Sequence, residues 1–264
     1  MKHFLMCEPR FFEVCYVINP WMEGNLGKVN RELAKQQWRN LHDIVAGRAS
    51  VSLIEPVAGL PDMVFTANAG LVHKKDVVVS SFLHAERQPE AKFFEQFFSS
   101  NGYSVQHLQK EMIFEGAGDA LFDTQGRLWV GSGIRSDPHA LDEIIAVLDV
   151  EAIGLELVDP HWYHLDTAFC PLPEGQAIAY AKAFSGKSVA ALNAAFGANI
   201  IWVLEADAKN FACNAISIGQ TISMHKASAE LKSALAKRGF EVIETDVSEF
   251  IKAGGACKCL TLEI

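Results

Sequence analysis

The chain has 264 residues, of which 50% are hydrophobic and 21% charged, and its formal net charge is −9. Such a chain can bury a sizeable core as one large domain or two small ones, which argues against a disordered protein. The acidic balance argues against a nucleic-acid binder, which needs a basic face, and it is compatible with a small cationic substrate.

The sequence predicts neither a membrane span nor a signal peptide. No apolar run approaches the roughly 20 residues that cross a bilayer, and the first apolar segment is broken by Glu8, Pro9 and Arg10. We therefore expect a cytoplasmic protein without a membrane partner, whose six cysteines stay reduced.

Apolar and amphipathic segments alternate along the whole chain. Two apolar segments at 3–9 and 15–20 precede an amphipathic stretch at 29–45, which predicts a helix. Four further units each predict two strands and then a helix. They lie at 63–72, 77–82 and 89–102; at 118–123, 127–133 and 139–148; at 165–172, 176–181 and 187–196; and at 214–219, 221–225 and 229–240.

Small polar residues or a cysteine recur among these units with a nearly constant spacing. These markers are Asn19, Asn68, Asp119, Asp166, Asn214 and Cys259. Their separations of 45 to 51 residues fall in the range of propellers and solenoids. Five strand–strand–helix units closed around one axis would bring the markers to one central cavity. From the spacing alone, an ordinary layered α/β fold is an equally good interpretation.

Several titratable side chains are candidates for catalysis. His164 and Asp166 are two residues apart, so on a strand they would share one face. A histidine can act as a general base near neutral pH and a carboxylate can hold a cation, although a lone histidine is more often structural. Glu115 and Asp119 flank a glycine-rich segment, where the alternative is a turn with solvated acids.

Other polar residues suit substrate binding. Asn68 lies among apolar residues and needs hydrogen-bond partners, whereas Asp62 after a proline could simply begin a strand. Arg87 and Arg135 each follow a second strand, and arginine matches a carboxylate geometrically. Most arginines on a surface have no such role, so this pair gains interest only from the repeat.

Two thiols stand in the terminal segment AGGACKCLTLEI. Cys257 and Cys259 have no second cysteine pair or histidine at zinc spacing, so a structural metal is not expected. A nucleophilic cysteine needs a base and a flexible seat. The glycines supply the flexible loop, and His164 could be the base.

The segments FEGAGD, YHLDTAFCPL, FACN and AGGACKCLTL, in this order, resemble the guanidino-group-modifying enzymes, also called the pentein or amidinotransferase superfamily. The resemblance covers essentially the whole chain and implies a five-fold pseudosymmetric α/β propeller of ββαβ-type units around a central cavity. Within the superfamily, YVINPWM, PDMVFTANAGLV and HAERQPE look most like arginine dihydrolases.

Carried over by position, the resemblance implies Cys259 as nucleophile, His164 as general acid and base, and Glu115 as the acid that orients His164 or the substrate. Asp166 matches a guanidinium-binding carboxylate, and the two arginines match clamps for the substrate's α-carboxylate. The implied substrate-binding residues are Asn19, Asn68, Arg87, Asp119, Arg135 and Asp166. No cofactor and no metal are implied.

Three differences from the deiminases and the dimethylarginine hydrolases indicate where in the superfamily this chain belongs. EGAGD is one residue longer than the EGGD of deiminases, which leaves the role of Asp119 open. Dimethylarginine hydrolases usually carry Glu-Asp where this chain has Ala67-Asn68, and they lack Asp166 in its slot.

These departures favour an arginine dihydrolase that gives ornithine, ammonia and carbon dioxide through a Cys-linked alkylthiouronium. The alternatives are a dimethylarginine dimethylaminohydrolase, a deiminase that stops at citrulline, and an inactive amino-acid-binding module. An amidinotransferase is less expected, because no feature protects the intermediate from water. We expect residues 1–264 to form a single catalytic domain.

Overall fold

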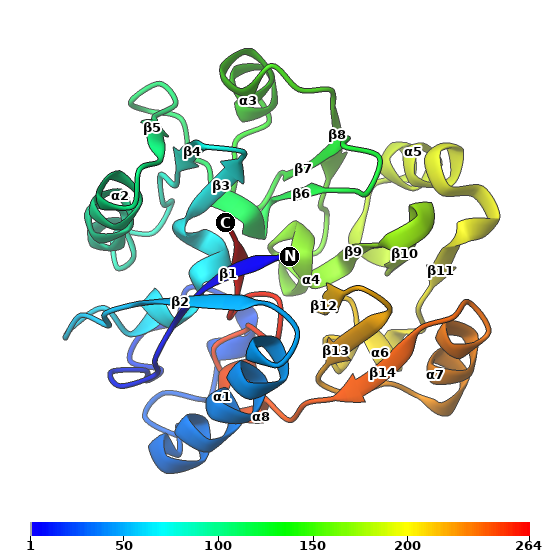
Figure 1. Ribbon diagram of the computed structural model, residues 1–264, viewed down its shortest axis with the longest axis horizontal. Coiled ribbons are helices and arrows are strands. Elements are labelled where there is room, and N and C mark those ends of the chain that lie inside the picture. The colour runs from blue at the N-terminus through cyan, green and yellow to red at the C-terminus, as the bar shows by residue number, and fades with distance from the viewer. Residues whose placement is uncertain (1) are drawn as a thin grey trace.

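The computed structural model describes residues 2–264, which form five three-stranded sheets around a central axis (Figure 1). The strand orders are β15-β1-β2, β3-β4-β5, β6-β7-β8, β11-β10-β9 and β12-β13-β14. In every sheet the middle strand pairs antiparallel with one neighbour and parallel with the other. The predicted five-fold α/β propeller is therefore confirmed.

The strands are short, as a small repeat requires. They are β1 (His3–Cys7), β2 (Ser50–Ile54), β3 (Gly70–His73), β4 (Asp76–Val79), β5 (Ser104–Gln106), β6 (Ala120–Phe122), β7 (Leu128–Ser132), β8 (Ala152–Glu156), β9 (Phe169–Leu172), β10 (Gln176–Ala179), β11 (Ile200–Trp202), β12 (Ile216–Ile218), β13 (Thr221–Met224), β14 (Glu241–Glu244) and β15 (Leu262–Glu263).

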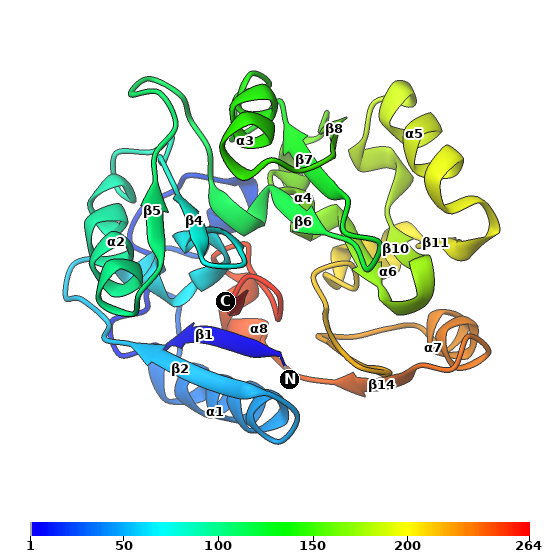
Figure 2. The ribbon, with the colours of Figure 1, turned by 45° about the horizontal axis from the view of Figure 1, so that its top comes forward.

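One helix in each unit connects the two parallel strands and covers the outside of its sheet (Figures 1 and 2). These helices are α1 (Arg31–Ala46), α2 (Ala91–Ser100), α3 (Ala140–Leu148), α5 (Gly186–Phe196) and α7 (Ala229–Ala236). Three shorter ones are α4 (Leu165–Ala168), α6 (Glu205–Lys209) and α8 (Ser248–Ile251). None of the helices within residues 2–264 combines the length and apolarity that a membrane crossing requires.

Helix α1 shows how the sequence specifies these elements. The Asn30 side chain accepts from the Leu33 amide at 3.1 Å and so satisfies one free donor of the first turn. Trp38, Leu41 and Val45 then recur at helical spacing and are buried on one face. The amphipathic stretch predicted over 29–45 therefore forms the helix that packs the first unit.

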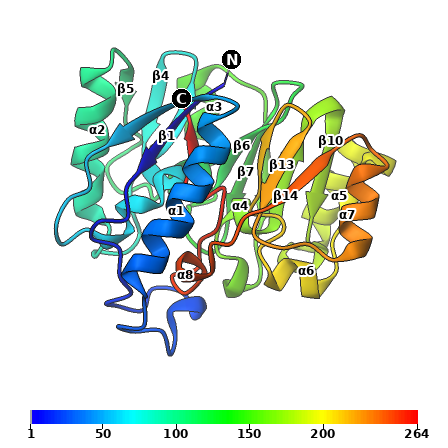
Figure 3. The ribbon, with the colours of Figure 1, turned by 60° about the horizontal axis from the view of Figure 1, so that its bottom comes forward.

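The C-terminal strand closes the ring. β15 pairs antiparallel with β1, with Leu262 opposite Leu5, so both chain ends lie near the axis at one mouth of the propeller (Figures 1 and 3). A cavity of about 540 Å³ opens between the two termini and the far ends of β3, β6, β9 and β12. It contains none of the predicted catalytic side chains.

The polar markers lie in helical turns before the inner strands, which differs from the strand ends that the pattern predicted. The predicted strand at 165–172 begins only at Phe169, and Asp166 lies within α4. The prediction that His164 and Asp166 share the face of a strand is therefore wrong. A run of buried apolar residues does not distinguish a helical turn from a strand.

The marker of the first unit is Cys259, which precedes β15. Asn19 does not occupy the repeat position, because it follows β1 and caps the short turn Pro20–Met22 by accepting from the Trp21 amide. The first unit is split between the two ends of the chain, and Asn19 matches the repeat spacing only by coincidence.

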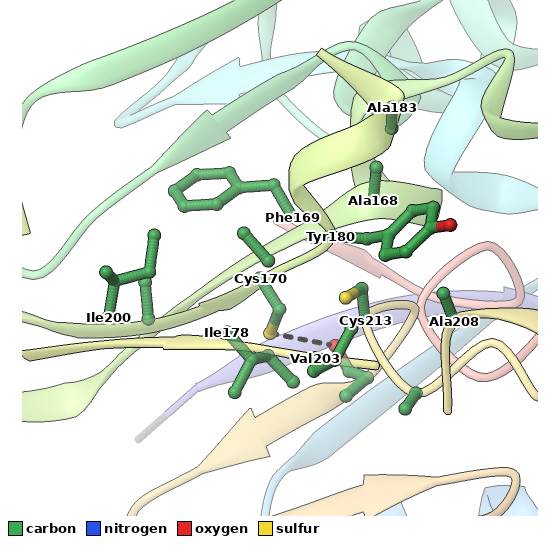
Figure 4. Packing of buried hydrophobic residues seen from close by; sticks show 14 of the residues in the cluster. Ala168, Phe169, Cys170, Ile178, Tyr180, Ala183, Ile200, Val203, Ala208 and Cys213 are labelled. Carbon is green, nitrogen blue, oxygen red and sulfur yellow. Dashed lines mark hydrogen bonds between the residues drawn. The ribbon is translucent and has the colours of Figure 1, made fainter. Parts of the chain in front are cut away.

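Apolar packing around β9 supports two of these turns, and Cys170 Sγ lies 3.5 Å from the Ala215 carbonyl just before β12 (Figure 4). Phe169 packs edge-on against Trp129, with ring centroids 5.6 Å apart, and Ile178 faces Cys170 across the β9–β10 pair. Burying each large apolar side chain contributes about 1.5–3 kcal/mol. The core thus fixes the chain immediately after α4 and immediately before β12.

Candidate active site

A narrow pocket lies on the axis at the mouth opposite the two termini, where the helical turns before the inner strands converge. It is lined by Ile18, Asn19, Met22, Asp62, Phe65, Asn68, Arg87, Arg135, Tyr163, Ala253, Gly255 and Cys259. Its free space is about that of a single water molecule. An amino acid therefore does not fit in the pocket in this conformation.

Cys259 presents its sulfur to this pocket from a tight turn. Its amide donates to Asn214 Oδ1 at 3.1 Å, and its carbonyl accepts from the Ala67 amide at 3.1 Å. The Asp166 carboxylate oxygens lie 3.4 and 3.6 Å from Sγ. Burial and this carboxylate raise the pKa of the Cys259 thiol well above its ordinary value. The resting sulfur is therefore a thiol.

The glycines before Cys259 lie where other side chains approach the backbone too closely for a Cβ atom. Gly254 has φ of +86°, and a Cβ there would lie 2.8 Å from both Asn19 Oδ1 and Tyr163 Oη. Only glycine adopts this conformation without strain and leaves that space. The glycine-rich segment is thus a packing device that brings the Cys259 turn against the pocket wall.

His164, Glu115 and Arg135 form a buried chain of charge-assisted hydrogen bonds. His164 Nε2 lies 2.7 Å from Glu115 Oε2, and Arg135 Nη1 donates to the same oxygen at 2.8 Å. Burial alone would raise the pKa of Glu115, but the Arg135 guanidinium and the His164 hydrogen bond hold it well below its ordinary value. Glu115 is therefore an anion that fixes the ring of His164.

Gly118 allows this histidine to pack closely. A Cβ on Gly118 would overlap Asn68 Nδ2 and lie 3.2 Å from His164 Nδ1. The GAG turn therefore lets Asn68 and His164 lie against the same stretch of backbone.

Arg87 and Asn68 belong to a second buried network. Arg87 Nε and Nη2 donate to the two oxygens of Glu90 at 3.0 and 2.8 Å, and Nη1 donates to Asn68 Oδ1 at 2.9 Å. Nη2 also donates to the Asp62 carbonyl at 3.2 Å. Four of the five guanidinium N–H groups are engaged, which leaves one for a substrate carboxylate.

Two pocket residues were missed as candidates. Asp62 Oδ2 accepts from Tyr16 Oη at 2.9 Å, but Oδ1 is buried without a hydrogen-bond partner. Such an oxygen in a pocket is a ready acceptor for a ligand cation. Tyr163 donates to the Gly254 carbonyl at 2.8 Å and lies under Arg135, 4.6 Å from ring centroid to guanidinium. The acidic residue after Pro61 was the available signal for Asp62.

The other predicted site residues differ in their contacts. Asp119 is fully buried and outside the pocket lining; it accepts from the Leu165 amide at 2.9 Å and from Ser136 Oγ at 2.7 Å. These bonds position the turn that carries His164 and Asp166. Asn19 lines the pocket and donates to the Ala253 carbonyl at 3.0 Å.

Cys257 is buried and does not line the pocket. All six cysteines are free thiols. Within residues 2–264, no three side chains of histidine, cysteine, aspartate or glutamate are grouped so as to hold a metal ion.

Comparisons with known proteins agree with this geometry. The family model for eukaryotic N,N dimethylarginine dimethylhydrolase matches residues 22–264. The bifunctional arginine dihydrolase/ornithine cyclodeaminase AgrE of Nostoc sp. is 49% identical over 99% of this chain, which spans 37% of that relative's length. The N(G),N(G)-dimethylarginine dimethylaminohydrolase of Mycobacterium tuberculosis is 40% identical over 100% of this chain and 86% of its own.

A solved structure of the N-terminal domain of ArgZ, an arginine dihydrolase from Cyanobacteria bound to substrate, superposes with a TM-score of 0.99. The identity is 48%, over 100% of this chain and 98% of that one. The chain therefore belongs to the eukaryotic-type N,N dimethylarginine dimethylhydrolase family, within the pentein superfamily of guanidino-group-modifying enzymes.

Proposed function

We propose that the chain hydrolyses the guanidinium of free arginine through Cys259 and releases ornithine, ammonia and carbon dioxide. The observation that carries this proposal is the Cys259 sulfur, which lies 3.4 Å from the Asp166 carboxylate and lines a pocket together with Asn68, in a chain 49% identical to AgrE over nearly its whole length. A buried pocket with an unpaired carboxylate oxygen, Asp62 Oδ1, suits a cation.

The pocket offers a partner for each charged group of arginine. Asp166 would hold the guanidinium beside the sulfur, and Asp62 Oδ1, which lacks a partner, would accept from the α-ammonium. The remaining N–H of Arg87 would donate to the α-carboxylate. Arg135 is committed to Glu115 and to the Ile18 carbonyl, so its part is to neutralise Glu115 as much as to bind substrate.

The arrangement supports covalent catalysis by a thiol. A guanidinium beside Sγ favours the thiolate, because its charge offsets the Asp166 carboxylate that raises the thiol pKa. The thiol gives its proton to His164, and the thiolate sulfur attacks the guanidinium carbon and forms a C–S bond. His164 then gives a proton to the departing nitrogen, the C–N bond breaks, and ammonia leaves an alkylthiouronium.

Water completes the first cycle. His164 takes a proton from a water molecule, and the resulting hydroxide attacks the same carbon. The C–S bond then breaks and regenerates the Cys259 thiolate. The product is the ureido compound citrulline. A second attack on the ureido carbon, loss of its terminal nitrogen as ammonia and hydrolysis to a carbamate that decarboxylates would give ornithine.

Asn68 favours this second cycle. Its Oδ1 faces Arg87 and its Nδ2 donates to the Glu115 carbonyl at 3.0 Å, so the amide is fixed with one further N–H available. A neutral amide can donate to a ureido oxygen, whereas a carboxylate at this position would repel it.

Dimethylarginine is the second candidate substrate. The match to the family model and the 40% identity to the mycobacterial dimethylaminohydrolase favour it. Citrulline and dimethylamine would then be the products, from a single cycle of the same chemistry.

The steps above use only protein side chains and water, so no cofactor is part of the proposal. We infer that residues 1–264 act as one catalytic domain and that the protein works in a reducing compartment such as the cytoplasm, since its cysteines, including the exposed Cys15, are free. The AgrE relative is much longer than this chain, so its second activity is not part of this proposal.

Product analysis tests the proposal directly. The protein is incubated with arginine and, separately, with dimethylarginine, and ammonia, ornithine, citrulline and dimethylamine are quantified, with Cys259→Ser as the inactive control. Ornithine with two ammonia per arginine supports the dihydrolase. Dimethylamine release alone supports the second candidate, and binding of arginine without any product would identify an inactive binding module.

A further inference from the structure

Asn214 makes the shortest polar contact to the Cys259 sulfur. It is fully buried in the turn before β12, and its Nδ2 lies 3.0 Å from Sγ. The sequence pattern marked it only as a member of the repeat. Among residues 2–264, no other side chain donates a hydrogen bond to this sulfur.

The orientation of the Asn214 amide is fixed by its other partners. Nδ2 also donates to the Asp166 carbonyl at 3.0 Å, while Oδ1 accepts from the amides of Ala256 and Cys259 at 3.2 and 3.1 Å. Two N–H groups and two lone pairs are thereby used in full. Exchanging nitrogen and oxygen would set oxygen against a carbonyl and N–H against N–H, so the NH₂ group must face the sulfur.

The charges around the sulfur show why a donor is needed there. Asp166 lies 3.4 Å away and opposes a thiolate, and Lys258 on the same turn reduces this effect by acting on Asp166. Tyr163, Arg87 and Arg135 face Cys259 from the pocket wall. The two arginines are occupied by Glu90 and Glu115, which leaves Asn214 as the side-chain donor to the sulfur, beside the backbone amide of Ala256.

We propose that Asn214 is a catalytic residue that stabilises the Cys259 thiolate by donating a neutral N–H to it. The bond strengthens when the S–H proton is lost and the sulfur becomes charged, and it forms again when the sulfur leaves the tetrahedral adduct with its electron pair. This inference shares one assumption with the proposed function, namely that Cys259 is the nucleophile.

Alkylation of Cys259 tests the proposal without any substrate. The rate of labelling of the Cys259 peptide by iodoacetamide is followed by mass spectrometry from pH 6 upward in the wild type, N214A, N214D and the control N210A. Asn210 is exposed on the same segment, and its side chain donates to the Ala206 carbonyl at 2.9 Å. Asp at position 214 keeps the oxygen that holds the Ala256 and Cys259 amides and removes the donor to the sulfur.

Loss of a hydrogen bond to a charged group costs about 10- to 100-fold in thiolate population. We expect the midpoint pH of alkylation to rise by about one to two pH units in N214A and further in N214D, and to stay at the wild-type value in N210A. An unchanged midpoint in N214A would overturn the proposal, because a purely structural residue changes stability and not the ionisation of the sulfur. If N214A does not fold, an unchanged midpoint in N214D decides against it and a raised one supports it.

Kinetics with arginine separate this inference from the proposed function. We expect kcat to fall at least tenfold in N214A while KM changes little, since Asn214 contacts the sulfur and not the pocket that would hold the substrate. If the wild type releases no ammonia from arginine, the proposed function fails, yet the alkylation midpoints still test Asn214.

Discussion

Arg135→Ala removes the cation from a buried ion pair and should be strongly destabilising. Arg135 Nη1 lies 2.8 Å from Glu115 Oε2, and the two side chains are 3% and 0% exposed. Removing one partner of such a pair costs about 3–5 kcal/mol, because the other charge stays buried without compensation. Since 1 kcal/mol shifts Tm by about 2–4 °C in a protein of this size, we expect a Tm about 6–20 °C lower.

The pH dependence distinguishes this cause from lost packing against Tyr163. The pKa of Glu115 is held below its ordinary value, so the ion pair contributes stability above about pH 4.3 and loses it as the pH falls toward the folded pKa. Without Arg135, burial is opposed only by His164 and Arg87, so the pKa of Glu115 is higher than in the wild type and protonation at low pH relieves part of the penalty. The difference in unfolding free energy between wild type and variant should therefore be full at pH 7 and smaller near pH 4.

Urea unfolding followed by tryptophan fluorescence at both pH values measures this difference. Lys182→Ala is the control, because Lys182 pairs with Glu205 at 3.1 Å on the surface, and we expect no clear change there. The reasoning is refuted if Arg135→Ala melts within 2 °C of the wild type, or if its penalty is equal at pH 7 and pH 4.

Three further predictions concern turnover. Cys259→Ser should abolish ammonia release, whereas Cys257→Ser should retain most of it, because Cys257 does not line the pocket; the reverse result would show that Cys257 is the nucleophile. His164→Ala should lower kcat by about 10²–10⁴-fold, as for the loss of a general acid and base, and a near wild-type kcat would remove His164 from the mechanism. Agmatine, which lacks the α-carboxylate, should have a much lower kcat/KM than arginine; equal use would contradict a carboxylate site at Arg87.

The fold was predictable because the repeat imposes one pattern five times. Each unit shows strand, turn, strand and helix signals, and a 45- to 51-residue period can bury its apolar faces only against neighbouring units. The convergence of Asn68, Asp166 and Cys259 on the axis follows from the same symmetry. Local conformation was less predictable: α4 is fully buried, so its apolar pattern is the same as that of a strand.

Pairing within the site could not be predicted from spacing. Arg135 binds Glu115 across the two ends of the β6–β7 pair within one unit, whereas Asn214 and Cys259 come from neighbouring units and meet at an angle that spacing does not give. The sequence named arginines and carboxylates as candidate site residues, but which of them face each other and which face the pocket requires coordinates. Asp62 illustrates the limit, since only its unpaired Oδ1 distinguishes it from a residue that begins a turn.

Asn68→Asp should decide how far the reaction runs. Asn68 is 2% exposed, accepts from Arg87 Nη1 at 2.9 Å and donates to the Glu115 carbonyl at 3.0 Å. An aspartate would keep the bond to Arg87 but set a second oxygen against the Glu115 carbonyl, so it has no proton to offer to a ureido oxygen. The guanidinium of arginine presents only donors and tolerates a carboxylate, whereas citrulline presents a carbonyl and would be repelled.

We therefore expect the wild type to give about two ammonia per arginine and Asn68→Asp to accumulate citrulline or lose activity. Ammonia release and amino-acid chromatography measure both, with Asn210→Ala as the control. If the wild type stops cleanly at citrulline, Asn68 acts only as the hydrogen-bonded link between Arg87 and the Glu115 backbone.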